Sequence, residues 1–125
     1  MKKYLLLIIF SLLFTSKGYS NNYLFTKITK LDEPWGSAFI NNNEIIITEK
    51  TGKIKIVNVV LKEVSEIKHN LNFVEVGQGG LLDIIHQNNT LWISYSENRG
   101  DSKTSTSIAK AELNTKELNF KNIFQ

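Results

Sequence analysis

Strand-like segments occur in two similar groups of four along the chain, and this repeat restricts the fold more than any other feature. Residues 45–47 of the first group match residues 91–93 of the second, 46 residues further on. On the same pattern we align residues 38–40 with residues 83–85. A four-stranded unit that recurs roughly every 40 to 50 residues is typical of β-propeller blades. A small β-sandwich is also built from short strands at such spacing, so the repeat alone leaves both folds open.

The composition favours an all-β chain, because it contains a single proline and many of the β-branched residues that pack well on pleated sheets. In the first group the expected strands are residues 35–40, 44–49, 53–57 and 59–67, preceded by a strand at 23–31. The alternative for residues 59–67 is an amphipathic helical turn. In the second group the expected strands are residues 81–85, 90–95, 104–113 and 117–124. The inner strands are apolar and the outer strands alternate, as expected for blades whose inner strands crowd the ring axis. We therefore place blade 1 at about 35–68 and blade 2 at about 80–125, within a domain spanning 21–125.

Short polar segments predict the turns between these strands. Asparagine tolerates positive φ, so residues 41–43 and 86–89 are predicted to be hairpin turns. Residues 50–52 and 114–116 are predicted to be turns as well. Residues 97–103 are polar throughout, and we expect them to form a long, solvated loop.

A glycine-rich segment, residues 75–80, lies between the two groups and is called the glycine loop below. Glycine costs backbone entropy and is kept where the chain needs positive φ or close approach. Gln78 stands among three glycines, and its amide offers two donors and an acceptor. The apolar residues 81–85 follow directly and are predicted to be a buried strand. The loop is either a tight turn with a solvated glutamine or a device that presents Gln78 to a ligand.

Residues 1–20 have the pattern of a secretory signal peptide. A basic start, residues 1–3, precedes an apolar run, residues 4–14, that is too short to span a bilayer comfortably. Small residues at 18 and 20 then provide a cleavage site after Ser20. The alternative is an uncleaved N-terminal anchor. We expect a bacterial protein that is periplasmic or secreted, with no membrane segment after cleavage.

The basic character of the chain belongs to this leader. Of 15 basic and 12 acidic residues, three lysines and no acid lie within residues 1–20, so 12 of each remain. This balance gives no support to a nucleic-acid partner. The lack of cysteine excludes a disulfide framework and a thiolate metal site. The acids and histidines show no spacing that suggests a metal site.

Four stretches resemble the opening of the soluble glucose/sorbosone dehydrogenases, aldose sugar dehydrogenases that use pyrroloquinoline quinone (PQQ). They are residues 31–39, 46–54, 77–83 and 93–96, and the resemblance covers most of residues 31–125. It implies a six-bladed β-propeller, of which this chain would contain about the first two blades. It also implies oxidation of the C1 hydroxyl of an aldose to the lactone, with a histidine as general base and PQQ as hydride acceptor. A Ca²⁺ ion would hold and polarise the cofactor, and an external electron acceptor would reoxidise it.

The resemblance assigns one functional residue to this chain: Gln78 matches the glutamine that contacts PQQ. We expect the turn at residues 49–52 and the longer loop at residues 97–103 on the same face, where both are candidates for the rim of the pocket. The alternative for each is a solvated surface loop, and for residues 97–103 we favour it. The motif of the catalytic histidine has no match, since His69 precedes the glycine loop and His86 lies in a predicted turn on the other face. The family's His-Pro-Asp-Phe turn is shortened there. We therefore expect no catalytic residue and no metal ligand in this chain, and an inactive fragment.

Two other interpretations stay open on the sequence. The first is a non-enzymatic exported propeller whose channel binds a ligand or a partner. The second is a small secreted β-sandwich without a site. A propeller enzyme would carry the histidine motif about one blade length after residue 125.

Overall fold

The computed structural model describes residues 23–125, and the signal peptide predicted for residues 1–20 lies outside this range. The described chain is all-β. Its strands are β1 (Pro34–Phe39), β2 (Glu44–Glu49), β3 (Ile54–Asn58), β4 (Glu63–His69), β5 (Leu81–Gln87), β6 (Thr90–Asn98), β7 (Thr104–Glu112), β8 (Glu117–Leu118) and β9 (Lys121–Phe124). Within residues 23–125 there is no helix long and apolar enough to cross a membrane.

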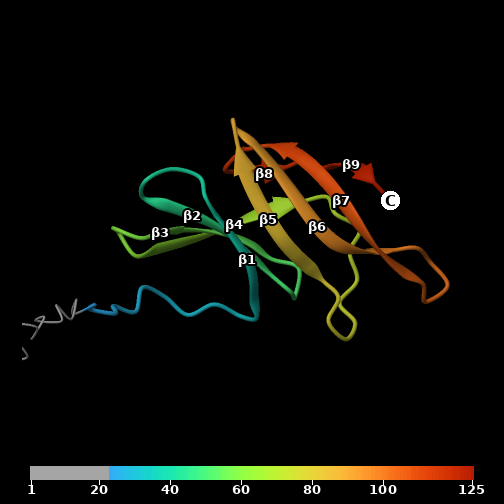
Figure 1. The fold of residues 1–125 in the computed structure, drawn as a ribbon, viewed down its shortest axis with the longest axis horizontal. Coiled ribbons are helices and arrows are strands. Elements are labelled where there is room, and N and C mark those ends of the chain that lie inside the picture. The colour runs from blue at the N-terminus through green and yellow to red at the C-terminus, as the bar shows by residue number, and fades with distance from the viewer. Residues whose placement is uncertain (1–22) are drawn as a thin grey trace, which may run out of the picture.

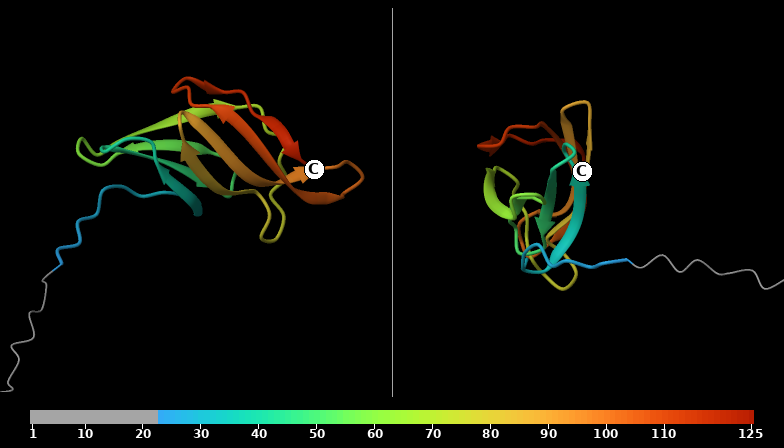
Figure 2. Two further views of the ribbon diagram at one scale, coloured as in Figure 1. Left: turned by 45° about the horizontal axis from the view of Figure 1, so that its top comes forward. Right: turned by 90° about the vertical axis from the view of Figure 1, so that its left-hand side faces the viewer.

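The strands form two sheets that follow the two predicted groups, except that β8 of the second group joins the first sheet (Figure 1). The first has the order β1-β2-β3-β4-β8, and its first four strands are antiparallel hairpin neighbours. The second has the order β5-β6-β7-β9 and is antiparallel throughout. Figure 2 shows the same two sheets from other sides, with the N-terminal segment running away from both.

One apolar core lies between the sheets. On β6, alternate side chains from Leu91 to Tyr95 point into it, as the period of a strand requires. The buried members of the core are Ile46, Ile54, Ile56, Ile67, Leu81, Ile84, Leu91, Ile93, Tyr95, Ala109, Ala111, Leu118 and Phe120. Because both sheets contribute, burial of apolar surface holds them together as one unit.

The innermost strands, β1 and β5, lie side by side. A Cβ atom on Gly36 would stand 2.7 Å from the Asp83 Cα atom, so only glycine fits on β1 at this approach. The Thr48 hydroxyl, which is fully buried, donates to the Leu82 carbonyl and accepts from the Gly36 N–H at 3.0 Å. A single side chain of β2 therefore ties the inner strands of the two sheets together.

The repeat is visible in the hydrogen bonds of both sheets. The Asp83 N–H donates to the Ser94 hydroxyl at 3.1 Å, just as the Gly36 N–H donates to Thr48. Gly36 is therefore the counterpart of Asp83, and Ala38 is the counterpart of Ile85 by strand register. The predicted alignment of residues 38–40 with 83–85 is wrong by two residues. The first hairpin is one residue longer than the second, which accounts for one of these two residues.

Two predicted strands differ from the structure: one is absent, and the other begins later than expected. Residues 23–31 form no strand, and Leu24 and Phe25 are 91% and 93% exposed. Residues 59–62 form a turn, and β4 begins only at Glu63. The reason is Asn58, whose side-chain oxygen accepts the N–H groups of Val60 and Leu61 and so closes a turn after β3.

The expected last strand, residues 117–124, is divided between the sheets. Glu117–Leu118 pairs in parallel with β4 of the first sheet, and Lys121–Phe124 pairs with β7 of the second. Between them, the Phe120 N–H donates to the Asn70 side chain at 2.7 Å, and the Asn70 amide donates to the Phe120 carbonyl at 3.1 Å. These two hydrogen bonds hold the chain where it crosses from the first sheet to the second, and Leu118 and Phe120 are buried there.

The hairpin after β5 is tighter than expected. Its loop consists of Asn88 and Asn89, with φ of 48° and 60°, which fits a two-residue type I′ turn. His86 therefore lies in β5 and not in the turn where we expected it. Similarly, β6 continues to Asn98, so Glu97 belongs to a strand rather than to the polar loop.

Candidate functional site

The glycine loop connects the two sheets at one end of the molecule, where it projects as the yellow-green loop at the lower edge of Figure 1. It lies between the β2–β3 turn and the end of β6. The Leu81 N–H donates to the Lys50 carbonyl at 3.4 Å, and the Ser96 N–H donates to the Gly80 carbonyl at 2.9 Å. The end of the loop is thereby bonded to one residue of each sheet.

Glycine is required in this loop for two separate reasons. Gly77 has φ of 57° with nothing within 4 Å of a Cβ position, so its backbone conformation decides the residue. At Gly80 a Cβ atom would stand 2.1 Å from the Lys50 carbonyl oxygen, so the close approach of two backbones decides it. The Gly79 N–H closes the tip by donating to the Val76 carbonyl at 2.7 Å.

Gln78 is the second central residue of this turn and is exposed. Within the described chain its amide makes no hydrogen bond to another group. Its two donors and its acceptor are thus free for a ligand. The structure places Gln78 on an exposed turn shortly before the buried start of β5, on a backbone that is bonded at the joint of the two sheets. Its contact with a cofactor stays a prediction.

The β2–β3 turn, residues 49–52, contacts the glycine loop, but its members differ in exposure. The Lys50 ammonium lies 3.3 Å from a Glu33 carboxylate oxygen and 3.9 Å from one of Glu75. Glu49, in contrast, is fully buried, so it does not line a rim. The backbone of Lys50, rather than the whole segment, meets the loop.

The buried Glu49 carboxylate joins three segments. Its Oε1 atom accepts the Asp32 N–H at 2.7 Å and the Lys55 ammonium at 2.8 Å. Burial raises the pKa of Glu49, but the hydrogen bonds from Lys55 and Asp32 and the charges of Lys55 and Lys53 outweigh it and lower the pKa overall. Glu49 is therefore an ionised anchor of β2 and not a proton donor.

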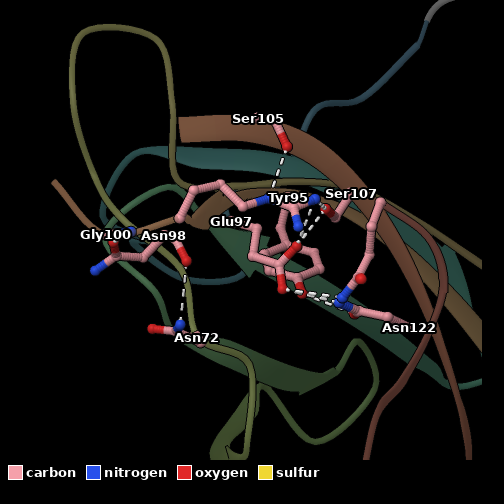
Figure 3. Close-up of polar contacts among 10 residues, drawn as sticks. Asn72, Tyr95, Glu97, Asn98, Gly100, Ser105, Ser107 and Asn122 are labelled. Atoms are coloured by element: carbon pink, nitrogen blue, oxygen red, sulfur yellow. Dashed lines mark hydrogen bonds and ion pairs between the residues drawn. The ribbon is translucent and has the colours of Figure 1, made fainter. Parts of the chain in front are cut away.

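Glu97 is the centre of a polar network on β6, β7 and β9 (Figure 3). Ser107 donates to its Oε2 atom at 2.6 Å, Arg99 lies 3.0 Å from the same atom, and Asn122 donates to Oε1 at 2.9 Å. The Ser107 bond lowers the pKa of Glu97, burial opposes it, and the Asn122 bond and the Arg99 charge lower it further. The carboxylate is already occupied, so we assign it to holding the sheet together. The prediction that residue 97 is solvated is wrong.

Both histidines bind backbone carbonyl groups. His69 Nε2 lies 2.8 Å from the Gly52 carbonyl oxygen, and its ring centroid is 6.0 Å from that of Phe73. His86 Nδ1 lies 3.1 Å from the Phe39 carbonyl oxygen and so links β5 to β1. A carbonyl only accepts, so each of these ring nitrogens is a donor. Both histidines have packing roles.

No metal cluster adjoins Gln78 in the part of the chain that the structure describes, and the best-formed hollow there lies elsewhere. Residues 23–125 contain no group of three or more histidines, cysteines or acids placed to hold a metal ion. A hollow of about 480 Å³ lies beside Thr90, Lys110 and Lys121. Because β6 starts at Thr90 and meets the glycine loop at Ser96, this hollow is at the opposite end of the second sheet.

Comparison with known proteins decides the family. The model of the family described as Glucose / Sorbosone dehydrogenase matches residues 31–125. The chain belongs to the glucose/sorbosone dehydrogenase family. It is 31% identical over 111 residues to the aldose sugar dehydrogenase YliI of Escherichia coli strain K12, a match that covers 77% of this chain and 28% of the relative.

Solved structures agree with this membership of the glucose/sorbosone dehydrogenase family. The soluble aldose sugar dehydrogenase of Escherichia coli in its apo form is 30% identical, with a TM-score of 0.68 over 75% of this chain and 30% of that one. A glucose dehydrogenase is 27% identical, with a TM-score of 0.69 over 75% and 30%. The PQQ-bound aldose sugar dehydrogenase of Streptomyces coelicolor is 17% identical, with a TM-score of 0.67 over 77% and 31%, and shares the fold.

These likenesses identify the two sheets as neighbouring β-propeller blades, and they decide against the β-sandwich. The chain spans about 28% of the length of its curated relative. The prediction of an all-β chain with about two blades of a propeller is thus confirmed.

Sequence reasoning missed the contacts of two residues at the joint of the two sheets: Thr48 bonds the strand after the glycine loop, and Lys50 contacts the loop itself. Thr48 gave no signal beyond a hydroxyl in an apolar strand, because its partners are backbone groups, the Gly36 N–H and the Leu82 carbonyl. The sequence predicts Lys50 as part of the turn and candidate rim at residues 49–52, but not its ion pairs. Its place one residue after a buried strand, with acids on both neighbouring segments, was the available signal.

Proposed function

We propose that this chain is the N-terminal part of a PQQ-dependent aldose sugar dehydrogenase that oxidises the sugar C1 hydroxyl to the lactone. The observation that carries the proposal is the exposed Gln78 amide, free of partners within the described residues and held on a close-packed glycine loop between two blades. Family membership and the PQQ-bound relative with the same fold support it.

The residues present fit PQQ in two respects. The Gln78 amide can donate to or accept from the carbonyl and carboxylate oxygens of such a cofactor. Gly79 and Gly80 place no side chain next to the Gln78 amide. A Cβ atom on Gly79 would collide with Ser96, and one on Gly80 would collide with Lys50. When bound, PQQ supplies the hydride acceptor, while Gln78 helps to orient it.

The remaining chemistry is proposed for other parts of the protein. The family resemblance implies a Ca²⁺ ion, a histidine base and an external electron acceptor. Neither histidine of the chain is placed to act as the base. His69 Nε2 lies against the Gly52 carbonyl and its Nδ1 accepts the Leu71 N–H, while the Nε2 atom of His86 is buried away from solvent. We therefore propose that residues 1–125 alone do not oxidise sugars.

Binding of PQQ tests the proposal. The protein is expressed from its own reading frame, and PQQ is titrated while tryptophan fluorescence is followed. Gln78→Ala should weaken binding by about 1–3 kcal/mol, or roughly 5- to 150-fold in Kd, because one buried hydrogen bond is lost. Gln87→Ala is the matched control, since Gln87 is an exposed glutamine at the far end of β5. Equal affinities for wild type and Gln78→Ala would remove Gln78 from the site.

Export is a separate part of the proposal. It rests on the basic start and the apolar run within residues 1–20. We expect the protein to be released from bacterial cells by osmotic shock and to begin at Asn21 when its N-terminus is sequenced. A protein that stays with the membrane fraction and begins at Met1 would support the uncleaved anchor instead.

A further inference from the structure

Lys50 contacts the glycine loop on both sides of Gln78. Its ammonium lies 3.9 Å from the Glu75 carboxylate, at the start of the loop. Its carbonyl accepts the Leu81 N–H at 3.4 Å, directly after the end of the loop. Its Cγ atom stands 2.9 Å from where a Gly80 Cβ atom would be. The two ends of a six-residue loop thus meet at one residue of the neighbouring blade.

Lys50 is itself firmly held. Its side chain is 18% exposed, and its N–H donates to the Glu33 carbonyl at 3.0 Å. The ammonium is also 3.3 Å from the Glu33 carboxylate. It therefore joins the segment before β1, the end of β2 and the glycine loop.

The tip of the loop needs such support. Between Glu75 and Gly80 the structure shows one backbone hydrogen bond inside the loop, from Gly79 to Val76. Two glycines with positive φ leave the backbone with many accessible conformations. Order that is already present before a ligand binds does not have to be supplied by the binding energy.

We infer that Lys50 is a positioning residue that holds the glycine loop in the conformation that presents Gln78. The inference rests on the proposed function, in which Gln78 orients the cofactor. Lys50 itself acts through the loop, by its ion pair with Glu75 and its contact with Gly80.

The two glutamates provide a matched pair of variants. Glu75→Gln removes the ion pair to the loop, whereas Glu33→Gln removes the shorter ion pair to the segment before β1. If ion-pair length alone mattered, Glu33→Gln would have the larger effect. If Lys50 positions the loop, Glu75→Gln has the larger effect.

Amide hydrogen exchange on the protein from its own reading frame, without any ligand, tests this. In Glu75→Gln, exchange at Gly79 and Leu81 should rise about two- to fivefold, the range expected when a partly exposed ion pair is lost. In Glu33→Gln it should rise less than twofold. Lys50→Met should match Glu75→Gln, and Lys50→Arg should restore the wild-type rates. Unchanged exchange in Glu75→Gln, or a larger change in Glu33→Gln, would overturn the inference.

A PQQ titration of the same variants separates this inference from the proposed function. We expect Glu75→Gln to raise the Kd for PQQ by about the same two- to fivefold. If PQQ does not bind even to the wild type, the proposed function fails, while the exchange rates still decide whether Lys50 holds the loop. Circular dichroism of each variant shows that the fold is retained, and Glu75→Gln, at an exposed position, serves if Lys50→Met does not fold.

Discussion

At the scale of single residues, the structure separates carboxylates that stabilise the fold from groups that are free to bind. Glu49 and Glu97 are buried, and each carboxylate accepts hydrogen bonds from at least two donors, those of Glu49 at a single oxygen. Gln78 is exposed, and within the described residues it has no partner. This contrast explains why two acids near the glycine loop are poor candidates for catalysis, whereas a neutral amide is a good candidate for cofactor contact.

The lowered pKa values of Glu49 and Glu97 predict a loss of stability in acid. A carboxyl group whose folded-state pKa lies below its unfolded value stabilises the fold above the unfolded pKa, and this contribution disappears as the pH falls through the folded pKa. We therefore expect the Tm to be constant near neutral pH and to fall below about pH 4.5. Thermal unfolding followed by circular dichroism from pH 7 to pH 3 measures this.

Glu97→Gln isolates one of the two groups. At pH 7 it should cost about 1–3 kcal/mol, because Arg99 and Ser107 lose a charged partner. Its Tm should also depend less on pH than that of the wild type. Glu112→Gln, on the exposed side of β7, is the control and should change neither quantity. An equal acid dependence in wild type and Glu97→Gln would show that Glu97 does not contribute.

At the scale of elements, the sequence predicted the two groups of strands and most turns, because these depend on local patterns. The prediction from sequence failed where the structure of a segment depends on a partner far away in the sequence. Phe120 crosses between the sheets because Asn70, 50 residues earlier, pairs with its backbone. Glu97 was assigned to a loop because a charged residue in a strand has no local signature, whereas Ser107 and Asn122 make its burial possible. Residues 23–31 have a strand-like pattern but no neighbouring strand in the described chain.

The same reasoning applies to the site. Three glycines around one glutamine were sufficient to place Gln78 on an exposed turn, since two of them, Gly77 and Gly80, take the positive φ that glycine allows. Lys50 and Thr48 could not be found in this way, because their partners lie on the other side of the joint between the blades.

Thr48→Val tests the joint between the two inner strands. The substitution keeps the shape of the side chain but leaves the Gly36 N–H and the Leu82 carbonyl without their partner. We expect a loss of about 1–3 kcal/mol in the free energy of unfolding, measured by urea denaturation. Thr106→Val makes the same chemical change at an exposed position of β7 and should alter stability by less than about 0.5 kcal/mol. Similar losses in both variants would mean that Thr48 does not join the blades.

At the scale of the whole molecule, the outer faces of the two sheets carry large apolar side chains. Trp35 and Phe39 of β1 are 49% and 65% exposed, and Ile85 of β5 is 56% exposed. Each blade of a propeller packs against a neighbour on both faces. Exposed apolar side chains are therefore expected on a face that a further blade covers. The outer faces of a β-sandwich meet water and alternate with polar residues. The exposed apolar residues thus agree with the propeller fold that the solved relatives show.

Ile85→Ser tests whether the outer face of the second sheet is covered in the protein expressed from its own reading frame. If another blade packs on β5, the substitution removes a buried side chain and should lower the free energy of unfolding by about 2–4 kcal/mol. If the face meets water, the change should be below about 0.5 kcal/mol. Val60→Ser is the matched control, because Val60 is 64% exposed in the turn between β3 and β4. Urea denaturation of both variants compares the two losses. A loss for Ile85→Ser no larger than that for Val60→Ser would mean that no blade covers β5, because a covered isoleucine cannot be removed without leaving a cavity.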